Sequence, residues 1–549
     1  MRAKNNEGKD AEVYRALLET PSGKNWERLG LARRSGVVAP LFSVYSADSV
    51  GIGELADLDR LADWCRATGM SLLQLLPMND VGFDFQPYSA QSSFALEPMY
   101  LSFKRLTGVR LSPFLEDIAA LKGRFPTGPG RVNYGIKGAK LGLLWEIFRV
   151  SHRKGLASFE KFVEQNRFWL HDYAVFKTLK EVFGQSGWES WEEPFRRKDP
   201  AALERFAQEH EQQIEFQQWL QWQLYEQFRA AKRYARKQGV FLIGDIPFLV
   251  SRDSADVWAN QSYFKLHLAS GAPPDMFFAT GQRWGMPPYD WSRIEEHRYD
   301  YVVEKLRYAE HFFDFYRIDH VVGIFRVWTI PLSEPAETGG LNGVFDPKDE
   351  NEWEEHGRTL LRVMIDNTRM IPCAEDLGVV PKCSNKVLEE LGIPGMDVQR
   401  WTRDYEKTFD FKAPEAYRSV ALATVGTHDT SSLRGWWGFE AGTIDEMLFR
   451  RKCASRNISY DEVRDRLFDM SRAAHGRLRW RPEVTDAETL LRIIDRREEE
   501  ARDFISLYKE ACDEKERFLA FVGLDRPADS PGDAAFVRAA LQKAGDSIA

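Results

Sequence analysis

Residues 240–248 read VFLIGDIPF, a nearly continuous apolar run that contains one carboxylate, Asp245. Such a run indicates a strand covered on both faces, as in a parallel sheet. It follows a long stretch of helical composition that ends at Gly239, a residue type that commonly terminates helices. The segment therefore predicts a helix followed by a buried strand that carries an acid near its C-terminal end.

The same unit recurs in both directions along the chain. Helix-period stretches lead into further apolar runs, which are VVAPLFSVY (37–45), SLLQLLPM (71–78), FDFYRIDH (313–320), MIPCAEDLG (370–378) and SVALATVGTHD (419–429). Alternation of helices and buried strands predicts an α/β fold of repeated βα units, and we expect a (β/α)8 TIM barrel. A doubly wound open sheet is the competing fold, but the chain has no GxGxxG after a first strand and no GxxxxGK[ST].

Two long helical stretches, 101–239 and 438–522, interrupt the repeat and are rich in Glu, Lys, Arg, Gln and Leu. We interpret them as insertions in one catalytic barrel domain that spans 1–549. The segment 522–533, rich in Pro, Gly and Asp, is expected to be a loop.

Four of the apolar runs finish in an acid, and these acids are Asp245, Asp319, Glu375 and Asp429. In a (β/α)8 barrel the C-terminal ends of the strands converge on one mouth, where catalytic groups are placed. The pattern therefore predicts four carboxyl groups that face one another.

Asp319 has the strongest chemical context of the four. Arg317 lies two residues earlier, so a strand directs both side chains to the same side, where the guanidinium would hold the carboxylate ionised. Retaining glycoside chemistry needs such a nucleophile close to a second carboxyl that protonates the leaving oxygen. Glu375 is our candidate for the second group.

A structural explanation competes with this one, because Asp often ends a strand by capping the next helix or turn. For a single acid we favour capping, and Asp245 is evenly balanced between capping and orienting a substrate. His428, beside Asp429, taken alone would be a core histidine. Arg317 with Asp319 favours function, since a buried ion pair at a strand end has little structural reason to exist.

Two aromatic, Gly/Pro-rich segments without a regular period are expected to form loops beside the site. The segment 271–291 contains Gln282 and Trp284, an amide and a flat ring that suit a sugar, and it is our candidate lid. The segment 85–100, FQPYSAQSSFALEPMY, is expected to form another wall of the cleft.

Bulk composition excludes several classes of protein. The chain has 549 residues, 43% of them hydrophobic, and a net charge of −8, which offers no basic field for nucleic acid or an anionic membrane. Five scattered cysteines without a CxxC pair, together with an N-terminus that lacks an apolar signal core, favour a cytoplasmic protein. No apolar stretch approaches the roughly 18 residues of a membrane span.

The motifs resemble those of the 4-α-glucanotransferases, also called amylomaltases or disproportionating enzymes. The similarity runs from about Pro40 to Trp437, through LFSVYSADSVGIGE, QPYSAQSSFAL, GDIPFLVSRDSADVW, GAPPD with GQRWGMPPYDW, YRIDH, AEDLG and GTHDTSSLRGWW. Each motif is moderately specific, and their order and spacing together are very specific. The segments FSVYSADS, QPYSAQSSFAL and GMDVQRW (395–401) are closer to the plant cytosolic branch.

This resemblance implies a (β/α)8 barrel, retention at the anomeric carbon, and no metal or organic cofactor. It implies that Asp319 is the nucleophile, Glu375 the acid/base, and Asp429 a stabiliser of the transition state that His428 assists. Arg317 and Asp245 would support the nucleophile and the bound ring, and Gln282 with Trp284 would lie on the covering loop. The implied substrates are malto-oligosaccharides, maltose, glucose or a longer glucan.

The chain departs from the family pattern in three places. Val50 stands where many members carry Tyr, and Glu97-Pro98 replaces the usual Asn-Pro after SSFAL. After Trp437 nothing matches the strand that normally closes the barrel. Since an open barrel exposes sheet edges, we expect that the eighth strand has either diverged or is missing because the chain is truncated.

Three alternative functions remain open on the sequence alone. A metal-dependent barrel hydrolase would use Asp245, His320, His428 and Asp429, but it predicts an HxH pair that the sequence lacks. A glucan-binding protein without catalysis would leave the Arg317 and Asp319 pair incidental. An α-glucan hydrolase would share every catalytic residue, and only a water-excluding lid favours transfer over hydrolysis.

Overall fold

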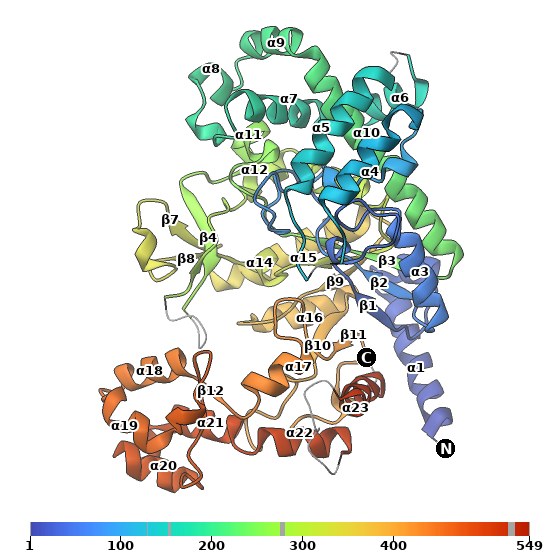
Figure 1. Ribbon diagram of the computed structural model, residues 1–549. Helices are drawn as coiled ribbons and strands as arrows, with labels where there is room; N and C mark the ends of the chain where they lie inside the picture. The colour runs from blue at the N-terminus through green and yellow to red at the C-terminus, as the bar shows by residue number, and fades with distance from the viewer. Residues whose placement is uncertain (1, 129, 152–154, 275–279, 525–532, 548–549) are drawn as a thin grey trace. The chain divides into compact units, whose positions relative to one another are not determined.

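The computed structural model describes residues 2–128, 130–151, 155–274, 280–524 and 533–547 (Figure 1). The chain forms two compact units. The first unit comprises Met1–Gly271, Arg283–Ala336 and Asn342–Ile393, and the second comprises Ala272–Gln282, Glu337–Leu341 and Pro394–Ala549. The prediction that one catalytic domain spans 1–549 stays a prediction.

The first unit is organised around a parallel sheet of five strands in the order β1-β2-β3-β6-β9. These strands are β1 (Gly36–Val38), β2 (Leu72–Gln74), β3 (Phe241–Ile246), β6 (Phe315–Ile318) and β9 (Ile371–Ala374). The register sets Asp245 opposite Arg317, and Arg317 opposite Cys373. Strand order follows chain order, as expected for successive βα units.

A strand forms in each of the predicted apolar runs, but the predicted burial is confirmed only for β3, β6 and β9, since β1, β2 and β11 (Ala421–Thr424) are partly exposed. Every residue of β6 and β9 is buried, and so are the four central residues of β3. The first predicted strand is shorter than its apolar run, because the chain turns at Pro40 and enters a short 3-10 helix, Leu41–Ser43.

Helices connect the strands of this sheet, as Figure 1 shows. They are α3 (Asp57–Ala67), α10 (Glu211–Lys237), α13 (Asp300–Ala309) and α15 (Glu350–Asp366), and α16 (Lys382–Leu391) follows the last strand, β9. Helix α3 ends near Gly69, whose φ of 76° suits glycine. Trp64 of this helix is 46% exposed.

The stretch 101–239 is helical, as predicted. Its helices are α4 (Leu115–Arg124), α5 (Ile136–Ser151), α6 (Ala157–Gln165), α7 (Arg167–Val182), α8 (Glu193–Arg196), α9 (Pro200–Glu209) and α10. Helices α5, α6, α7 and α10 pack on one another in Figure 1. One continuous hydrophobic core joins these helices to the sheet.

A second, small sheet has four strands in the order β5-β4-β7-β8. Its strands are β4 (Leu268–Ala272), β5 (Gln282–Arg283), β7 (Val327–Pro331) and β8 (Val344–Asp346). The segment 271–291, expected to be an irregular loop, therefore contains strand β5 and the end of β4. Residues 275–279 of this segment lie outside the described residues.

The remaining helices of the first unit are short or N-terminal. They are α1 (Arg2–Glu19), α2 (Gly23–Leu29), α11 (Ala255–Ala259), α12 (Trp291–Glu296) and α14 (Val322–Phe325). Helix α2 is fixed to the sheet end, since the Asn25 side chain donates hydrogen bonds to the carbonyls of Thr368 and Met370.

The second unit contains a parallel pair, β10 (Gly395–Val398) and β11 (Ala421–Thr424), and a short antiparallel pair, β12 (Ile444–Asp445) and β13 (Arg477–Leu478). Its helices are α17 (Leu433–Gly435), α18 (Glu446–Ser455), α19 (Tyr460–Leu467), α20 (Ala487–Ile494), α21 (Arg502–Ala511), α22 (Glu514–Val522) and α23 (Ala534–Gly545). The predicted helical stretch 438–522 is thus confirmed. Residues 525–532 of the predicted loop lie outside the described residues.

The described parts of the chain contain seven parallel strands of the repeat, five in the first unit and two in the second. This is the set that the apolar runs predicted, with β10 added before β11.

Candidate active site

Arg317 stands at the centre of a cluster of charged side chains at the strand ends of the first unit. We call Asp245, Arg317, Asp319 and Glu375 the site cluster. The Arg317 Nη1 atom donates to both Asp245 oxygens at 3.0 Å and to Asp319 Oδ1 at 2.7 Å. Its Nη2 atom lies 3.9 Å from Glu375 Oε2. Three of the four predicted carboxyl groups therefore meet on one guanidinium.

The carboxyl groups of the cluster differ in exposure. The Asp245 side chain is 0% exposed, Glu375 is 14% exposed and Asp319 is 27% exposed. Although burial favours a neutral guanidine, Asp245 and Asp319 raise the pKa of Arg317, so this side chain stays charged. Asp319 is thus the acid of the cluster that a substrate reaches most readily.

Asp245 is held by a tyrosine as well as by Arg317. The Tyr88 hydroxyl donates to Asp245 Oδ2 at 2.8 Å. Burial raises the pKa of Asp245 to about 7, and Arg317 opposes this rise. Burial and the neighbouring Asp245 raise the pKa of Tyr88, so its hydroxyl remains a proton donor.

Glu375 is oriented by the backbone that follows Asp319. The His320 amide donates to Glu375 Oε2 at 2.7 Å, and the Val321 amide donates to the Glu375 carbonyl at 3.1 Å. His320 adopts a φ of 47°, which turns the chain sharply after β6 and directs this amide at the carboxylate. Burial lowers the pKa of His320 to about 4, so its ring is neutral near pH 7.

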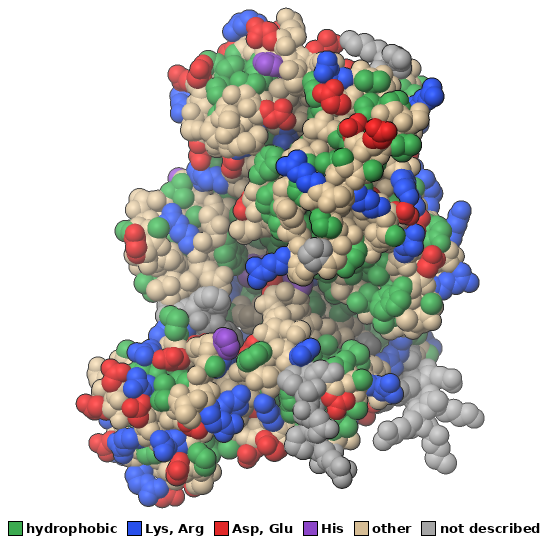
Figure 2. Space-filling model, viewed as in Figure 1, with side chains coloured by type: hydrophobic (Ala, Val, Ile, Leu, Met, Phe, Trp, Pro, Cys, Tyr) green, Lys and Arg blue, Asp and Glu red, His purple; other side chains and the backbone are tan. Residues whose placement is uncertain are grey.

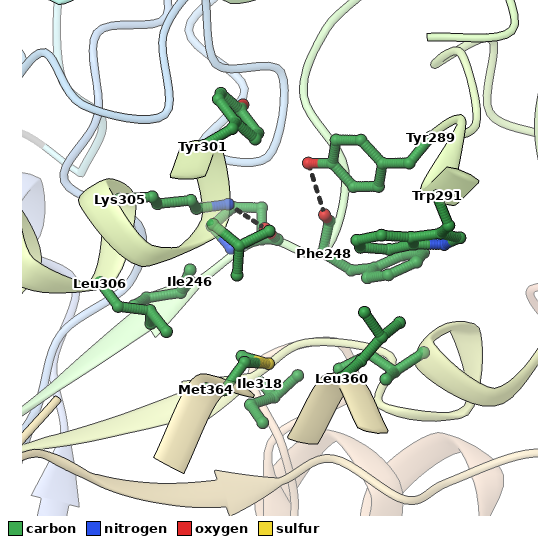
Figure 3. Close-up of a pocket in the computed structure, with 13 residues that line it drawn as sticks. Ile246, Phe248, Tyr289, Trp291, Tyr301, Lys305, Leu306, Ile318, Leu360 and Met364 are labelled. Atoms are coloured by element: carbon green, nitrogen blue, oxygen red, sulfur yellow. Dashed lines mark hydrogen bonds between the residues drawn. The ribbon is translucent and has the colours of Figure 1, made fainter. Parts of the chain in front are cut away.

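Behind the strand ends lies an apolar cavity of about 50 Å³, shown in Figure 3. Ile246 and Ile318, the neighbours of Asp245 and Asp319, line it. Lys305 donates to the Pro247 carbonyl at 3.0 Å, and Tyr289 donates to the Phe248 carbonyl at 3.1 Å, so both hold the turn after β3. Burial lowers the pKa of Lys305 to about 8.

The other predicted site residues are divided between the two units. Trp284 lies in the first unit with its ring edge-on to His320, at 5.0 Å between ring centroids. Gln282, in β5, belongs to the second unit. His428 and Asp429 follow β11 in the second unit, with 3.2 Å between His428 Nε2 and Asp429 Oδ2, and the Asp429 side chain is 64% exposed.

Sequence reasoning missed four contributors to this site. Tyr88 lies inside the QPYSAQ segment that the sequence assigned to the cleft wall, but nothing marked its hydroxyl as a partner of Asp245. Lys305 and Tyr289 reach the site only through backbone carbonyls, and the His320 amide leaves no trace in the sequence. The expected hydrogen bond between Arg317 and Asp319 is present.

Several features of the described residues bear on other functions. Lys, Arg, Asp and Glu side chains are interspersed over the face in Figure 2. None of the five cysteines forms a disulfide. Within the described residues, no group of three His, Cys, Asp or Glu side chains is arranged to hold a metal ion. No helix in that part of the chain combines the length and apolarity needed to cross a membrane.

Comparison with known proteins gives a consistent result. The family model described as 4-alpha-glucanotransferase matches residues 39–518. A 4-alpha-glucanotransferase of Chlamydia muridarum is 33% identical over 77% of this chain and 79% of its own length. The 4-alpha-glucanotransferase DPE2 of Oryza sativa is 27% identical over 75% of this chain and 59% of its own length.

Solved structures agree in fold. An amylomaltase from Streptococcus agalactiae, in complex with acarbose, has a TM-score of 0.64 at 22% identity and covers 84% of this chain and 98% of its own. The amylomaltase of Corynebacterium glutamicum also has a TM-score of 0.64, at 24% identity, over 79% of this chain and 59% of its own. The predicted α/β barrel fold class with helical insertions is thereby confirmed.

Proposed function

Because the chain belongs to the 4-alpha-glucanotransferase family, whose members act by retaining double displacement, we propose that Asp319 is its nucleophile and Glu375 its general acid/base. The observation that carries this assignment is the shared guanidinium: Arg317 contacts Asp319 at 2.7 Å and lies 3.9 Å from Glu375. Both acids therefore stand at one place, at the ends of adjacent strands.

In the first step the Asp319 carboxylate attacks the anomeric carbon of the donor sugar while Glu375 gives its proton to the departing glycosidic oxygen. The bond to the leaving sugar breaks, and a glycosyl ester of Asp319 forms. In the second step Glu375, now a carboxylate, takes the proton of an acceptor hydroxyl, which attacks the same carbon and releases Asp319. Two inversions give retention.

The neighbouring side chains support these two groups. Arg317 fixes Asp319 by its hydrogen bond, and Asp245 fixes Arg317. The complete burial of the Asp245 side chain favours this supporting role over direct contact with the bound ring. The His320 amide keeps Glu375 in place for proton transfer.

Roles for the remaining predicted residues rest on the family motifs. We assign Asp429 and His428 to hydrogen bonds with sugar hydroxyls that strengthen in the transition state. Gln282 and Trp284 belong to the segment 271–291, which we propose as a lid that offers an acceptor sugar a platform and excludes water. The edge-on packing of Trp284 against His320 supports a position of this ring beside the site cluster.

The substrates that we propose are an α-1,4-linked malto-oligosaccharide or glucan as donor, and glucose, maltose or a longer glucan as acceptor. The acarbose complex of an amylomaltase of similar fold supports this class of ligand. A cytoplasmic location is proposed because the five cysteines are free.

Incubation with maltotriose tests the function. Chromatography should show free glucose together with a ladder of longer oligosaccharides, whereas products that are only shorter than maltotriose would establish hydrolysis instead. Asp319→Asn should abolish both sets of products, and near-normal activity of this variant would refute the nucleophile. Activity that survives EDTA would exclude the metal-dependent alternative.

A further inference from the structure

The chain between β2 and the first insertion forms a closed loop, residues 79–97, which we call the Tyr88 loop. Its two ends are joined, since the Asp80 amide donates to the Ala95 carbonyl at 2.9 Å and the Glu97 amide donates to the Met78 carbonyl at 2.9 Å. Tyr88 lies in the middle of the loop, and its hydroxyl reaches Asp245, 157 residues away in sequence. The position of this hydroxyl therefore depends on what holds the loop.

Two lysines from the helical insertion reach the base of this loop. Asp80 accepts hydrogen bonds from Lys137 Nζ at 2.9 Å and from the Gly82 amide at 3.0 Å on one oxygen. On its other oxygen it meets Lys177 Nζ at 2.8 Å and the Tyr173 hydroxyl at 2.8 Å. Asp80 is 0% exposed, so every contact of its carboxylate comes from the protein.

The same lysines connect further parts of the loop. Lys137 Nζ also donates to Glu97 Oε2 at 2.8 Å, which ties the end of the loop to its beginning. Lys177 Nζ also donates to Gln91 Oε1 at 2.9 Å. We call Asp80, Glu97, Lys137 and Lys177 the loop network.

Tyr88 lies between Gly82 and Gln91 in the sequence, and these two residues contact each other across the loop. The Gln91 amide donates to the Asp80 carbonyl at 2.7 Å, and the Gln91 side chain packs against Gly82. A Cβ atom on Gly82 would lie 2.6 Å from the Gln91 side chain, and Gly82 has a φ of 61°. Lys177 thus holds both sides of the loop. It contacts the Gln91 side chain directly, and it contacts Asp80, which accepts a hydrogen bond from the Gly82 amide.

Uncharged contacts secure the chain that follows. Three glutamines of α10 each accept from and donate to one backbone residue: Gln221 pairs with Leu96 at 2.7 and 2.9 Å, Gln227 with Ser102 at 2.9 and 3.0 Å, and Gln223 with Thr107 at 2.8 and 2.9 Å. With these pairs in place, the Tyr88 loop has a fixed exit. Residues 90 and 91 are held as well, since the Ser251 amide donates to the Ala90 carbonyl at 3.2 Å and the Ala255 amide donates to the Gln91 carbonyl at 2.8 Å. The loop network holds the opposite side of the loop, at residues 80–82, and joins it to the Gln91 side chain.

We propose that Lys177 and Lys137 of the helical insertion are positioning residues for the transfer reaction: through Asp80 they hold the Tyr88 loop so that the Tyr88 hydroxyl stays on Asp245. The proposal rests on the proposed function of the site cluster. The proposal assigns a role in the reaction to the helical insertion. Loss of a contact at Asp80 would let the Tyr88 hydroxyl move away from Asp245, and Asp245 in turn orients Arg317 and Asp319.

A double-mutant cycle on the full chain tests the proposal, with Lys177→Met, Tyr88→Phe and the combined variant assayed on maltotriose. Each single variant should lower kcat/KM by about tenfold to a hundredfold. The combined variant should have the same kcat/KM as the less active of the two single variants, because both changes break one chain of contacts. Losses that multiply would overturn the proposal, since Lys177 would then act independently of Tyr88.

The pH profile separates positioning from a general loss of structure. The Tyr88 hydrogen bond favours the carboxylate form of Asp245, so both single variants should move the acidic limb of kcat/KM to higher pH. An unmoved limb in Lys177→Met would count against the proposal. If Lys177→Met does not fold, Gln91→Met takes its place in the double-mutant cycle, because it removes only the contact between Lys177 and the Gln91 side chain.

Two controls complete the experiment. Lys198→Met breaks another ion pair of the same insertion, to Asp172 at 2.9 Å, and should leave the rate and pH profile unchanged. Asp319→Asn, measured alongside, tests the proposed nucleophile separately, so a failure of the cycle is distinguished from a failure of the proposed function.

Discussion

The site cluster and the loop network are both built from buried or partly buried charges in the first unit, but they differ in the number of cations that each carboxyl group meets. Asp80 meets two lysines, and although burial opposes ionisation, these lysines lower its pKa. Glu97 meets one lysine, and burial raises its pKa. Asp245 shares a single guanidinium with two further acids, and burial raises its pKa to about 7.

This comparison shows how one fold uses buried charge in two ways. In the loop network, Asp80 meets two lysines that keep its carboxylate ionised, so this group stabilises the structure of the loop. In the site cluster, three acids share the one guanidinium of Arg317, and burial raises the pKa of Asp245 to about 7. An excess of acids over cations costs stability, and of these two clusters only the candidate active site has such an excess.

The largest effect is expected from removing the one cation of the site cluster. Arg317→Met should lower kcat/KM on maltotriose by about a thousandfold or more, because Asp319 loses its positioning partner and three acids face one another unscreened. Initial rates of glucose release measure this. Arg307→Met, which breaks only an exposed pair with Glu304, should stay at the wild-type rate, and a loss below tenfold in Arg317→Met would contradict the central role of Arg317.

The next effect concerns the stability of the loop network. Asp80→Asn leaves two buried lysines short of a negative charge, so the apparent free energy of unfolding in urea should fall by about 3 kcal/mol. Replacement of an exposed acid such as Glu296 by Gln serves as the control. A fall of less than about 1 kcal/mol would show that the lysines do not depend on Asp80.

His320 gives an effect of intermediate size that depends on pH. Its pKa is lowered to about 4 in the folded protein, against an unfolded value near 6.5. The unfolded chain therefore binds a proton first as the pH falls, so the stability contributed by the neutral ring is complete above about pH 6.5 and is lost towards pH 4.

His320→Asn, which retains a residue type that tolerates a positive φ, should flatten this part of the stability profile by roughly 2 kcal/mol. Urea titrations at a series of pH values between 7 and 4 provide the measurement. Parallel profiles for the variant and the wild type would show that His320 is not the group that titrates.

Asp245→Asn should change stability least, although it removes a fully buried charge. Because the folded-state pKa of Asp245 is raised to about 7, ionisation destabilises the wild type as pH rises from about 4 to 7. At pH 8 the variant should therefore unfold within about 1 kcal/mol of the wild type, or be more stable. Its activity should fall, and a loss of stability as large as that of Asp80→Asn would remove the distinction between the two clusters.

Part of this picture could be predicted from the sequence because it depends on local spacing. The two-residue separation of Arg317 and Asp319 places both on one side of a strand, and the hydrogen bond between them follows from that period. The apolar runs located the buried strands for the same reason, and the strand-end acids pointed to Asp245 and Glu375.

The rest depends on contacts between distant segments. Lys137 and Lys177 lie in helical stretches where a lysine ordinarily indicates a solvated face, and only the packed structure shows that both are buried around Asp80. Tyr88 was within a segment expected near the cleft, but its partner could not be inferred. The assignment of residues 272–282 to the second unit likewise has no signal in the local sequence.

The three glutamine pairs of α10 have a consequence for how this region tolerates change. Each amide recognises a backbone N–H and C=O, so the contact makes no demand on the side chains at positions 96, 102 and 107. Burial still constrains Leu96 and Ser102, so only the exposed Thr107 can be replaced freely without loss of the pairing, whereas Glu in place of any of the three glutamines would remove a donor. The path of the chain from residue 96 to residue 107 is thereby specified by the helix that faces it, through backbone groups and not through the side chains of that path.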